Sequence, residues 1–170
     1  MSQTIDDFRN FFKNDQEFTS ATPQMIFEGV LSLIEKSLAH HEINVVMDIK
    51  DNIRLMMPYN DMIQVVLNLM NNAKDALIES SIKNPCIELI AVREGESLAL
   101  HVKDNGNGVP PSLTAKIFAP YFSTKSLNGT GLGLYICKSI VEKRMHGQVV
   151  YKKSEPGADF MVLLPLKETV

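Results

Sequence analysis

This sequence of 170 residues lacks the features typical of membrane-spanning, secreted and nucleic-acid-binding proteins. No apolar run approaches the roughly 18 residues that a helix needs to cross a bilayer. The opening stretch, MSQTIDDFRNFF, is polar and acidic and lacks the basic-then-apolar order of a secretory signal. A net charge of −3 disfavours non-specific binding to nucleic acid, which needs a basic face. We therefore expect a cytoplasmic domain that has no nucleic-acid partner.

Cysteine is also rare, because the chain has only Cys86 and Cys137. These two residues lie far apart in sequence and lack the close spacing of a metal-binding pair. Free, buried thiols in a reducing cytosol are the simplest interpretation. A length of 170 residues, with 45% hydrophobic and 22% charged residues, suits one globular domain with one core.

Segments in which apolar residues recur with the spacing of a helix or of a strand follow one another along the chain. Thr22 is placed to cap a first helix, Pro23 fits its first position, and Asn60 or Asp61 can cap the next helix. The predicted helices cover 22–38, 62–79 and 132–145, and the predicted strands 43–49, 53–57, 86–93, 98–103, 148–152 and 160–166. This pattern predicts the α+β class: a two-layer α/β sandwich, with a mixed sheet of about five strands packed on three helices.

Residues 104–133 differ from the rest, because five of the nine glycines lie there in a long irregular stretch. Such stretches in compact domains are usually functional or disordered. Asp104 directly follows a predicted strand, so its carboxylate could accept a hydrogen bond from an exocyclic amine such as that of adenine. Gly106 and Gly108 would let the backbone approach a ligand closely. Taken on its own, this short segment is explained more simply by a plain Asn-Gly turn.

Two further segments carry polar chemistry. Asn68 and Asn72 share one helical face, and amide oxygens suit Mg²⁺, although paired asparagines are also common in surface or core networks. The run Gly129-Thr130-Gly131-Leu132-Gly133 opens a helix, where backbone N–H groups and the helix dipole favour phosphate. It lacks the P-loop sequence, and it follows a long loop, unlike a dinucleotide fingerprint.

A fourth segment, residues 117–125, places aromatic side chains and a proline inside a polar loop. This composition suggests a lid of about residues 107–128, whose rings anchor it to the domain. Thr124 and Lys125 could then bring a hydroxyl and a cation to phosphates. A small satellite core under a loop is the plainer alternative.

Taken in order, the four segments resemble the N, G1, F and G2 boxes of the superfamily that contains gyrase, the heat-shock chaperone, histidine kinases and MutL. The Phe-x-Pro-Tyr-Phe-x-Thr-Lys form of residues 118–125 and the closing strand 157–165 are similar to those of bacterial sensor histidine kinases. The resemblance covers about residues 22–167. It implies the ATP-binding catalytic domain of a two-component kinase, which uses ATP and Mg²⁺ to phosphorylate a histidine.

The resemblance also implies a role for individual residues. Asn72 would hold Mg²⁺, and Asn68 and Lys125 are the catalytic candidates. Asn68 stands where hydrolytic relatives carry a glutamate, and an amide cannot accept a proton, which favours phosphoryl transfer over hydrolysis. The role of Asp75 stays open. The expected nucleotide contacts are Asn68, Asn72, Asp104, Gly106, Gly108, Thr124, Lys125, Thr130, Gly131, Leu132 and Gly133.

No histidine in the chain fits the acceptor. His41 starts a segment similar to an acceptor box, but it lacks the following proline and runs into a predicted strand. We expect residues 1–20 to be the end of a dimerisation helix plus a linker, and residues 21–170 to be the catalytic domain. The expected partners are the dimerisation domain that carries the acceptor and a response regulator. The parent protein would be a homodimer and this piece a monomer; an inner-membrane anchor on the parent stays open.

Two alternatives remain at this point. One is a self-contained ATPase, which a glutamate in place of Asn68 would favour. The other is a nucleotide-binding regulatory module without phosphotransfer, because the four segments indicate binding more directly than catalysis.

Overall fold

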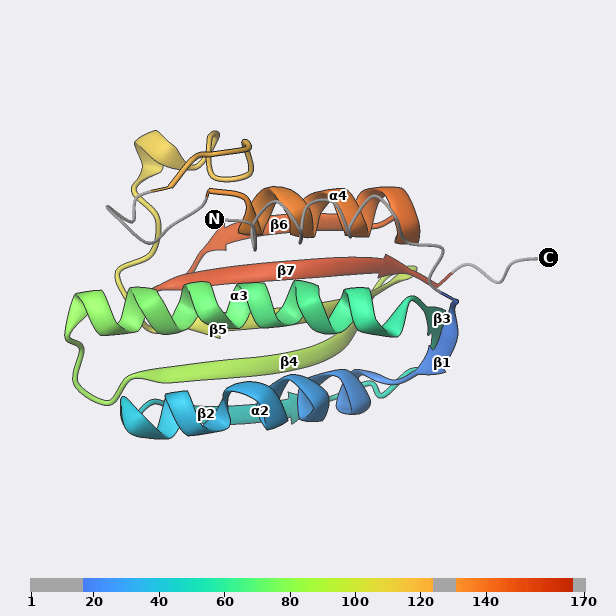
Figure 1. Cartoon of the computed structure of the whole chain (residues 1–170), viewed down its shortest axis with the longest axis horizontal. Helices are drawn as coiled ribbons and strands as arrows, with labels where there is room; N and C mark the ends of the chain where they lie inside the picture. The colour runs from blue at the N-terminus through green and yellow to red at the C-terminus, as the bar shows by residue number, and fades with distance from the viewer. Residues whose placement is uncertain (1–16, 124–130, 167–170) are drawn as a thin grey trace, which may run out of the picture.

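The computed structural model describes residues 17–123 and 131–166 of the chain. These residues form three α-helices, one 3-10 turn and seven strands (Figure 1). The helices are α2 (Pro23–His40), α3 (Tyr59–Ser80) and α4 (Gly133–Met145), and the turn is η1 (Pro111–Leu113). The strands are β1 (Thr19–Ala21), β2 (Asn44–Ile49), β3 (Leu55–Met57), β4 (Cys86–Glu94), β5 (Ser97–Asp104), β6 (Gln148–Lys153) and β7 (Ala158–Pro165).

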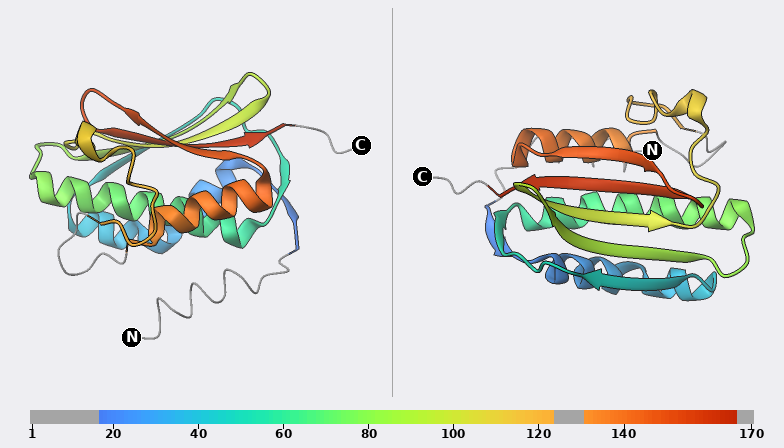
Figure 2. Two further views of the ribbon diagram at one scale, coloured as in Figure 1. Left: turned by 90° about the horizontal axis from the view of Figure 1, so that it is seen from above. Right: turned by 180° about the vertical axis from the view of Figure 1, so that it is seen from behind.

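Five of the strands form one mixed sheet in the order β2-β4-β5-β7-β6. β2 runs parallel to β4, which the long connection through β3 and α3 permits, and the other pairs are antiparallel. Figure 2 shows all three helices on one face of this sheet. No other described element covers the opposite face. The predicted two-layer α+β architecture is therefore confirmed.

The first helix starts as its sequence predicts. The Thr22 hydroxyl accepts a hydrogen bond from the Met25 backbone N–H at 3.3 Å, and Pro23 occupies the first turn. Phe27 and Val30 are fully buried beneath it. At its other end, His41 terminates α2 and leads into β2, so it is not in the middle of a helix, where an acceptor would be expected.

The expected cap of α3 is wrong. The helix begins at Tyr59, its N-cap position is Pro58, and no side chain makes a capping hydrogen bond. Asn60 and Asp61 therefore lie inside the first turn. Asp61 is buried there and pairs with Arg144 of α4, with 2.9 Å between Oδ2 and Nε. α3 packs between α2 and α4, and this ion pair joins α3 to α4.

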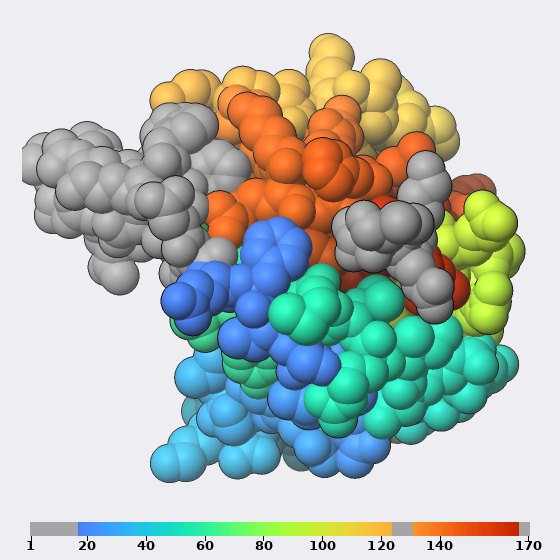
Figure 3. Space-filling view, turned by 90° about the vertical axis from the view of Figure 1, so that its right-hand side faces the viewer, coloured from blue at the N-terminus to red at the C-terminus, as the bar shows by residue number. Residues whose placement is uncertain are grey.

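The strand predicted at 53–57 does not join the main sheet. β3 pairs instead with β1 in a separate two-stranded antiparallel sheet, in which Thr19 lies opposite Met57. Figure 3 shows this end of the molecule, where β1 and β3 lie next to each other. β1 has three residues, which is too short to produce a readable alternation.

The core lies between the inward faces of the central strands and the helices that cover them. β5 and β7 pair in register from Ser97 opposite Pro165 to Asp104 opposite Ala158. Leu100 and Val162 fill the centre of the core between the sheet and the helices. None of the described helices is long and apolar enough to cross a membrane.

Candidate functional site

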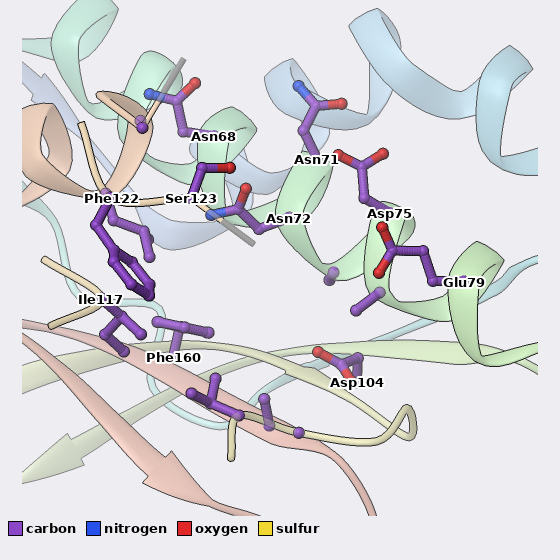
Figure 4. A pocket seen from close by; sticks show the side chains of 18 of the residues that line it. Asn68, Asn71, Asn72, Asp75, Glu79, Asp104, Ile117, Phe122, Ser123 and Phe160 are labelled. Carbon is purple, nitrogen blue, oxygen red and sulfur yellow. The ribbon is translucent and has the colours of Figure 1, made fainter. Parts of the chain in front are cut away.

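A cavity of about 350 Å³ opens above the ends of β5 and β7, between α3 and the start of α4 (Figure 4). Its size falls in the usual range for small-molecule sites. The sheet contributes its floor, the two helices its walls, and the segment between β5 and α4 its remaining side. The lining residues are Asn68, Asn71, Asn72, Ala73, Asp75, Ala76, Glu79, Asp104, Gly108, Val109, Pro110, Ile117, Phe122, Ser123, Gly131, Gly133, Leu134, Ala158 and Phe160.

Polar side chains line the cavity along one face of α3. Asn68, Asn72, Asp75 and Glu79 follow each other at spacings of four, three and four residues, which keeps them on one side of a helix. Beside this face, the buried thiol of Cys137 on α4 donates a hydrogen bond to the Val65 carbonyl of α3 at 3.5 Å. Burial raises the pKa of that thiol to about 12, so it stays protonated. The thiol serves to join α3 to α4 beside the cavity.

Asp104 ends β5 and lies on the cavity floor, where only 4% of its surface is exposed. Its Oδ1 accepts a hydrogen bond from the Gly106 N–H at 2.9 Å. Burial raises the pKa of the carboxyl group, and hydrogen bonds from the backbone at Gly106 and Ala158 oppose this rise. The charge of nearby Asp159 adds a smaller increase. The floor therefore presents a desolvated acceptor to whatever enters.

Two residues that the sequence did not single out hold Asp104 in place. Asn105 bridges the turn to the strand beside it: its Oδ1 accepts from the Cys86 N–H at 2.8 Å, and its Nδ2 donates to the Asn84 carbonyl at 3.0 Å. Gly157 has a φ of +97° and lies against the Asp104 carbonyl, where any Cβ would overlap it. The position of Gly157 directly before the last strand was the available signal for its role.

Aromatic contacts attach the segment between β5 and α4 to the sheet. The Phe118 ring meets Phe160 of β7 edge-on, with 6.3 Å between ring centroids. Ile117 is 7% exposed and lines the cavity together with Phe122 and Phe160. These apolar side chains face the polar side of α3, so the cavity has one apolar and one polar wall. Such a cross-section suits a flat heterocycle bearing polar edges.

A backbone contact connects this segment to the start of α4. The Tyr121 N–H donates to the Gly131 carbonyl at 2.8 Å. Gly131 has a φ of +73°, and a Cβ there would overlap the Tyr121 backbone. Gly133 is different, because a Cβ there would meet nothing within 4 Å and its φ is ordinary. Open space thus lies next to the first turn of α4, whose N–H groups favour anions.

Residues 58–168 match the family of histidine kinase-, DNA gyrase B- and HSP90-like ATPases. The chain belongs to this family. The two-component sensor PprA of Pseudomonas aeruginosa is 37% identical to it over 149 residues, which are 85% of this chain and 16% of PprA. The sensor protein CitS of Halalkalibacterium halodurans is 30% identical over 176 residues, covering 99% of this chain and 32% of CitS.

Solved structures agree. The catalytic domain of histidine kinase ThkA matches with a TM-score of 0.77 and 29% identity, over 88% of this chain and 95% of that one. The chain is thus an ATP-binding catalytic domain of the type found in two-component sensor histidine kinases, as its motifs predict. It spans about a sixth of PprA and a third of CitS, so both relatives contain much more protein.

The kinase domain brings most of the predicted contacts together. Asn68, Asn72, Asp104, Gly108, Gly131 and Gly133 all line the cavity. Gly106 lies beside it and donates to Asp104, whereas Leu132 is 5% exposed and belongs to the core. Predicted contacts Thr124, Lys125 and Thr130 lie outside the described residues. Their roles remain predictions.

Charge in the cavity of the kinase domain is uneven. Its described lining includes three carboxylates, from Asp75, Glu79 and Asp104, and no lysine or arginine. A nucleotide triphosphate is a polyanion, so the described lining alone cannot neutralise it. Binding therefore calls for a cation from another source.

Proposed function

We propose that this domain binds Mg-ATP in the cavity and holds the γ-phosphoryl group for transfer to a histidine on a dimerisation domain. One observation carries the proposal: the fold brings Asp104, Asn72 and the start of α4 around a single cavity. The chemistry of these three elements suits the base, the metal ion and the phosphates of Mg-ATP in turn. One is a hydrogen-bond acceptor, one is a metal-type amide, and one is a helix N-terminus.

The base would occupy the end of the cavity near Asp104. A desolvated carboxylate there accepts a hydrogen bond from the adenine amino group, and the contact is strong because little water competes. The apolar side chains of Ile117, Phe122 and Phe160 would pack on the ring. Gly106 keeps one carboxylate oxygen occupied, so the orientation of Asp104 is fixed before the ligand arrives.

The phosphates would lie between Asn72 and the first turn of α4. An amide oxygen is a suitable ligand for Mg²⁺, which prefers oxygen donors and is often completed by substrate phosphates. The lack of cations among the described lining residues fits a need for such an ion. Mg²⁺ would neutralise phosphate charge, with Lys125 and Thr124 as further proposed contacts and Thr130, Gly131 and Gly133 supplying N–H groups.

Transfer is favoured over hydrolysis by the side chain at position 68. The Asn68 amide lines the cavity and cannot take a proton from water. In the transfer, the bond between the γ-phosphorus and the β–γ bridging oxygen breaks as a bond to the acceptor imidazole nitrogen forms. ADP leaves, and the imidazole proton is lost to solvent. Positioning and charge neutralisation account for most of such catalysis.

The partners follow from the same proposal. The residues before β1 would be the end of a dimerisation helix plus a linker, whereas Thr19 and Ser20 pair with β3 and belong to the domain itself. The parent protein would be a homodimer, and a response regulator would receive the phosphoryl group. Histidine kinase ThkA, whose fold this domain shares, has been solved in complex with the response regulator TrrA. An inner-membrane anchor on the parent protein is compatible with this arrangement.

Calorimetry tests the binding step. ATP is titrated with and without Mg²⁺ into the wild-type domain, Asn72→Ala and the matched control Asn60→Ala, which changes an exposed residue on the same helix. We expect Mg²⁺-dependent binding by wild type and Asn60→Ala, and at least a tenfold loss for Asn72→Ala. Equal Mg²⁺-dependent affinity in all three proteins would refute the role of Asn72. No binding by wild type would refute the proposed function.

A further inference from the structure

The cavity face of α3 changes in chemistry along its length. Asn68 and Asn72 present neutral amides, whereas Asp75 and Glu79 present carboxylates. Glu79 lies seven residues beyond Asn72, or about 10 Å along the helix axis. In Figure 4, its carboxylate lies between those of Asp75 and Asp104. The acidic part of α3 therefore runs beside the end of the cavity where Asp104 lies.

Carboxylates at this place restrict what can lie against them. An ionised carboxylate accepts hydrogen bonds and repels phosphate, so the nucleotide must present donors here. A ribonucleoside has two kinds of donor: the exocyclic amine of the base and the two ribose hydroxyls. Asp104 is the acceptor for the amine under the proposed function. The ribose hydroxyls remain for Asp75 and Glu79.

The same stretch of α3 also leaves room for a sugar. Ala73 and Ala76 lie between the polar positions and line the cavity with methyl groups only. Ala73 is 4% exposed and Ala76 is half-buried, so Ala76 supplies most of the accessible methyl surface here. A small side chain beside two acceptors leaves space for a furanose ring, and the acceptors can meet its diol.

We propose that Asp75 and Glu79 accept hydrogen bonds from the ribose 2′- and 3′-hydroxyls and make the domain selective for ribonucleotides. This assignment rests on the proposed ATP site. Glu79 is exposed and Asp75 is half-buried, so water competes with both contacts. We therefore expect a moderate preference, about tenfold for ATP over each deoxy analogue.

The test compares affinities for ATP, 2′-deoxy-ATP and 3′-deoxy-ATP, all with Mg²⁺, by calorimetry. The proteins are wild type, Asp75→Ala, Glu79→Ala, the double variant, and the control Glu142→Ala on α4, which removes a partly exposed carboxylate paired with Lys138. Loss of a negative charge raises affinity for every triphosphate. The ratio of ATP to deoxy-ATP affinity cancels this effect, because the three ligands carry the same charge.

We expect wild type and Glu142→Ala to prefer ATP about tenfold, and the double variant to bind all three ligands within twofold. A wild type that binds ATP and the deoxy analogues equally would overturn the assignment and leave the proposed function standing. A preference for ATP that survives in the double variant would overturn the assignment in the same way. An equal, Mg²⁺-dependent loss of affinity for all three ligands in Asp75→Ala would also overturn it, because it would identify Asp75 as a metal ligand. Failure of wild type to bind any of them would overturn the proposed function and this assignment together.

Discussion

Asp104 can be changed in a way that separates stability from binding. In Asp104→Asn, the amide oxygen can still accept the Gly106 N–H that Oδ1 accepts at 2.9 Å. The second carboxylate oxygen becomes an NH₂ group, which is a donor and cannot accept from an adenine amine. The side chain keeps its shape, so the change removes a hydrogen-bond acceptor without creating a cavity.

The substitution should affect ATP binding and folding stability differently. A hydrogen bond to a charged acceptor contributes about 1.5–3 kcal/mol, so ATP affinity should fall roughly 10- to 150-fold. Stability should not fall. Because burial raises the pKa of Asp104 in the folded state, its contribution to stability is greatest below the unfolded pKa and is lost as the pH rises through the folded pKa. At pH 7 a neutral amide avoids that loss, which offsets a weakened backbone hydrogen bond at Ala158, so Asn should fold about as well as Asp.

The assay is Mg-ATP calorimetry and thermal unfolding at pH 7 on the same samples, with Asp48→Asn as the matched control at an exposed position of β2. We expect weaker binding and an unchanged or higher Tm only for Asp104→Asn. Unchanged affinity would refute the placement of the base. A lower Tm together with lost binding would show that Asp104 acts through the fold, and the reasoning from its buried charge would then be wrong.

Three more predictions follow from single contacts. The affinity of wild type for ATP should fall as the pH is lowered, because protonated Asp104 loses an acceptor. The raised pKa of Asp104 means that this loss should begin at a higher pH than for an ordinary aspartate, and calorimetry at several pH values checks this. Gly133→Ala should fold normally yet bind ATP more weakly, because the methyl enters open space by the first turn of α4, whereas Gly131→Ala should lower the Tm by straining a positive φ. Arg144→Met should cost about 3–5 kcal/mol in urea unfolding by leaving Asp61 buried without its partner, and the addition of Asp61→Asn should recover most of that loss.

Periodicity predicted the parts of the site that local sequence determines. Asn68 and Asn72 lie on one helical face because of their spacing, and that face lines the cavity as predicted. Asp104 was placed at a strand end, and β5 ends there. Helical periodicity and strand alternation gave the three helices and the strands of the sheet for the same reason. Each of these features depends on residues within a few positions of one another.

Contacts between distant parts of the chain could not be predicted in this way. Asp61 has the sequence context of a helix cap, but it pairs with Arg144, which only the packing of α4 on α3 brings near. β3 pairs with β1, a strand of three residues with no sequence signal of its own. Asn105 and Gly157 hold Asp104 through strands far apart in sequence. Tertiary packing decides all of these, and a single sequence does not encode it in a local pattern.

The two ends of the cavity are held by different kinds of structure, and this predicts how variants will sort. The Asp104 end is set into paired strands, with Gly157 against its carbonyl, so changes there should alter recognition of the nucleoside. The opposite end depends on a loop joined to α4 by the backbone bond between Tyr121 and Gly131. Changes at that bond should weaken binding of ATP much more than binding of adenosine, because adenosine lacks the phosphates that this end would hold. Equal losses for both ligands in Gly131→Ala would instead mean that the loop supports the whole cavity.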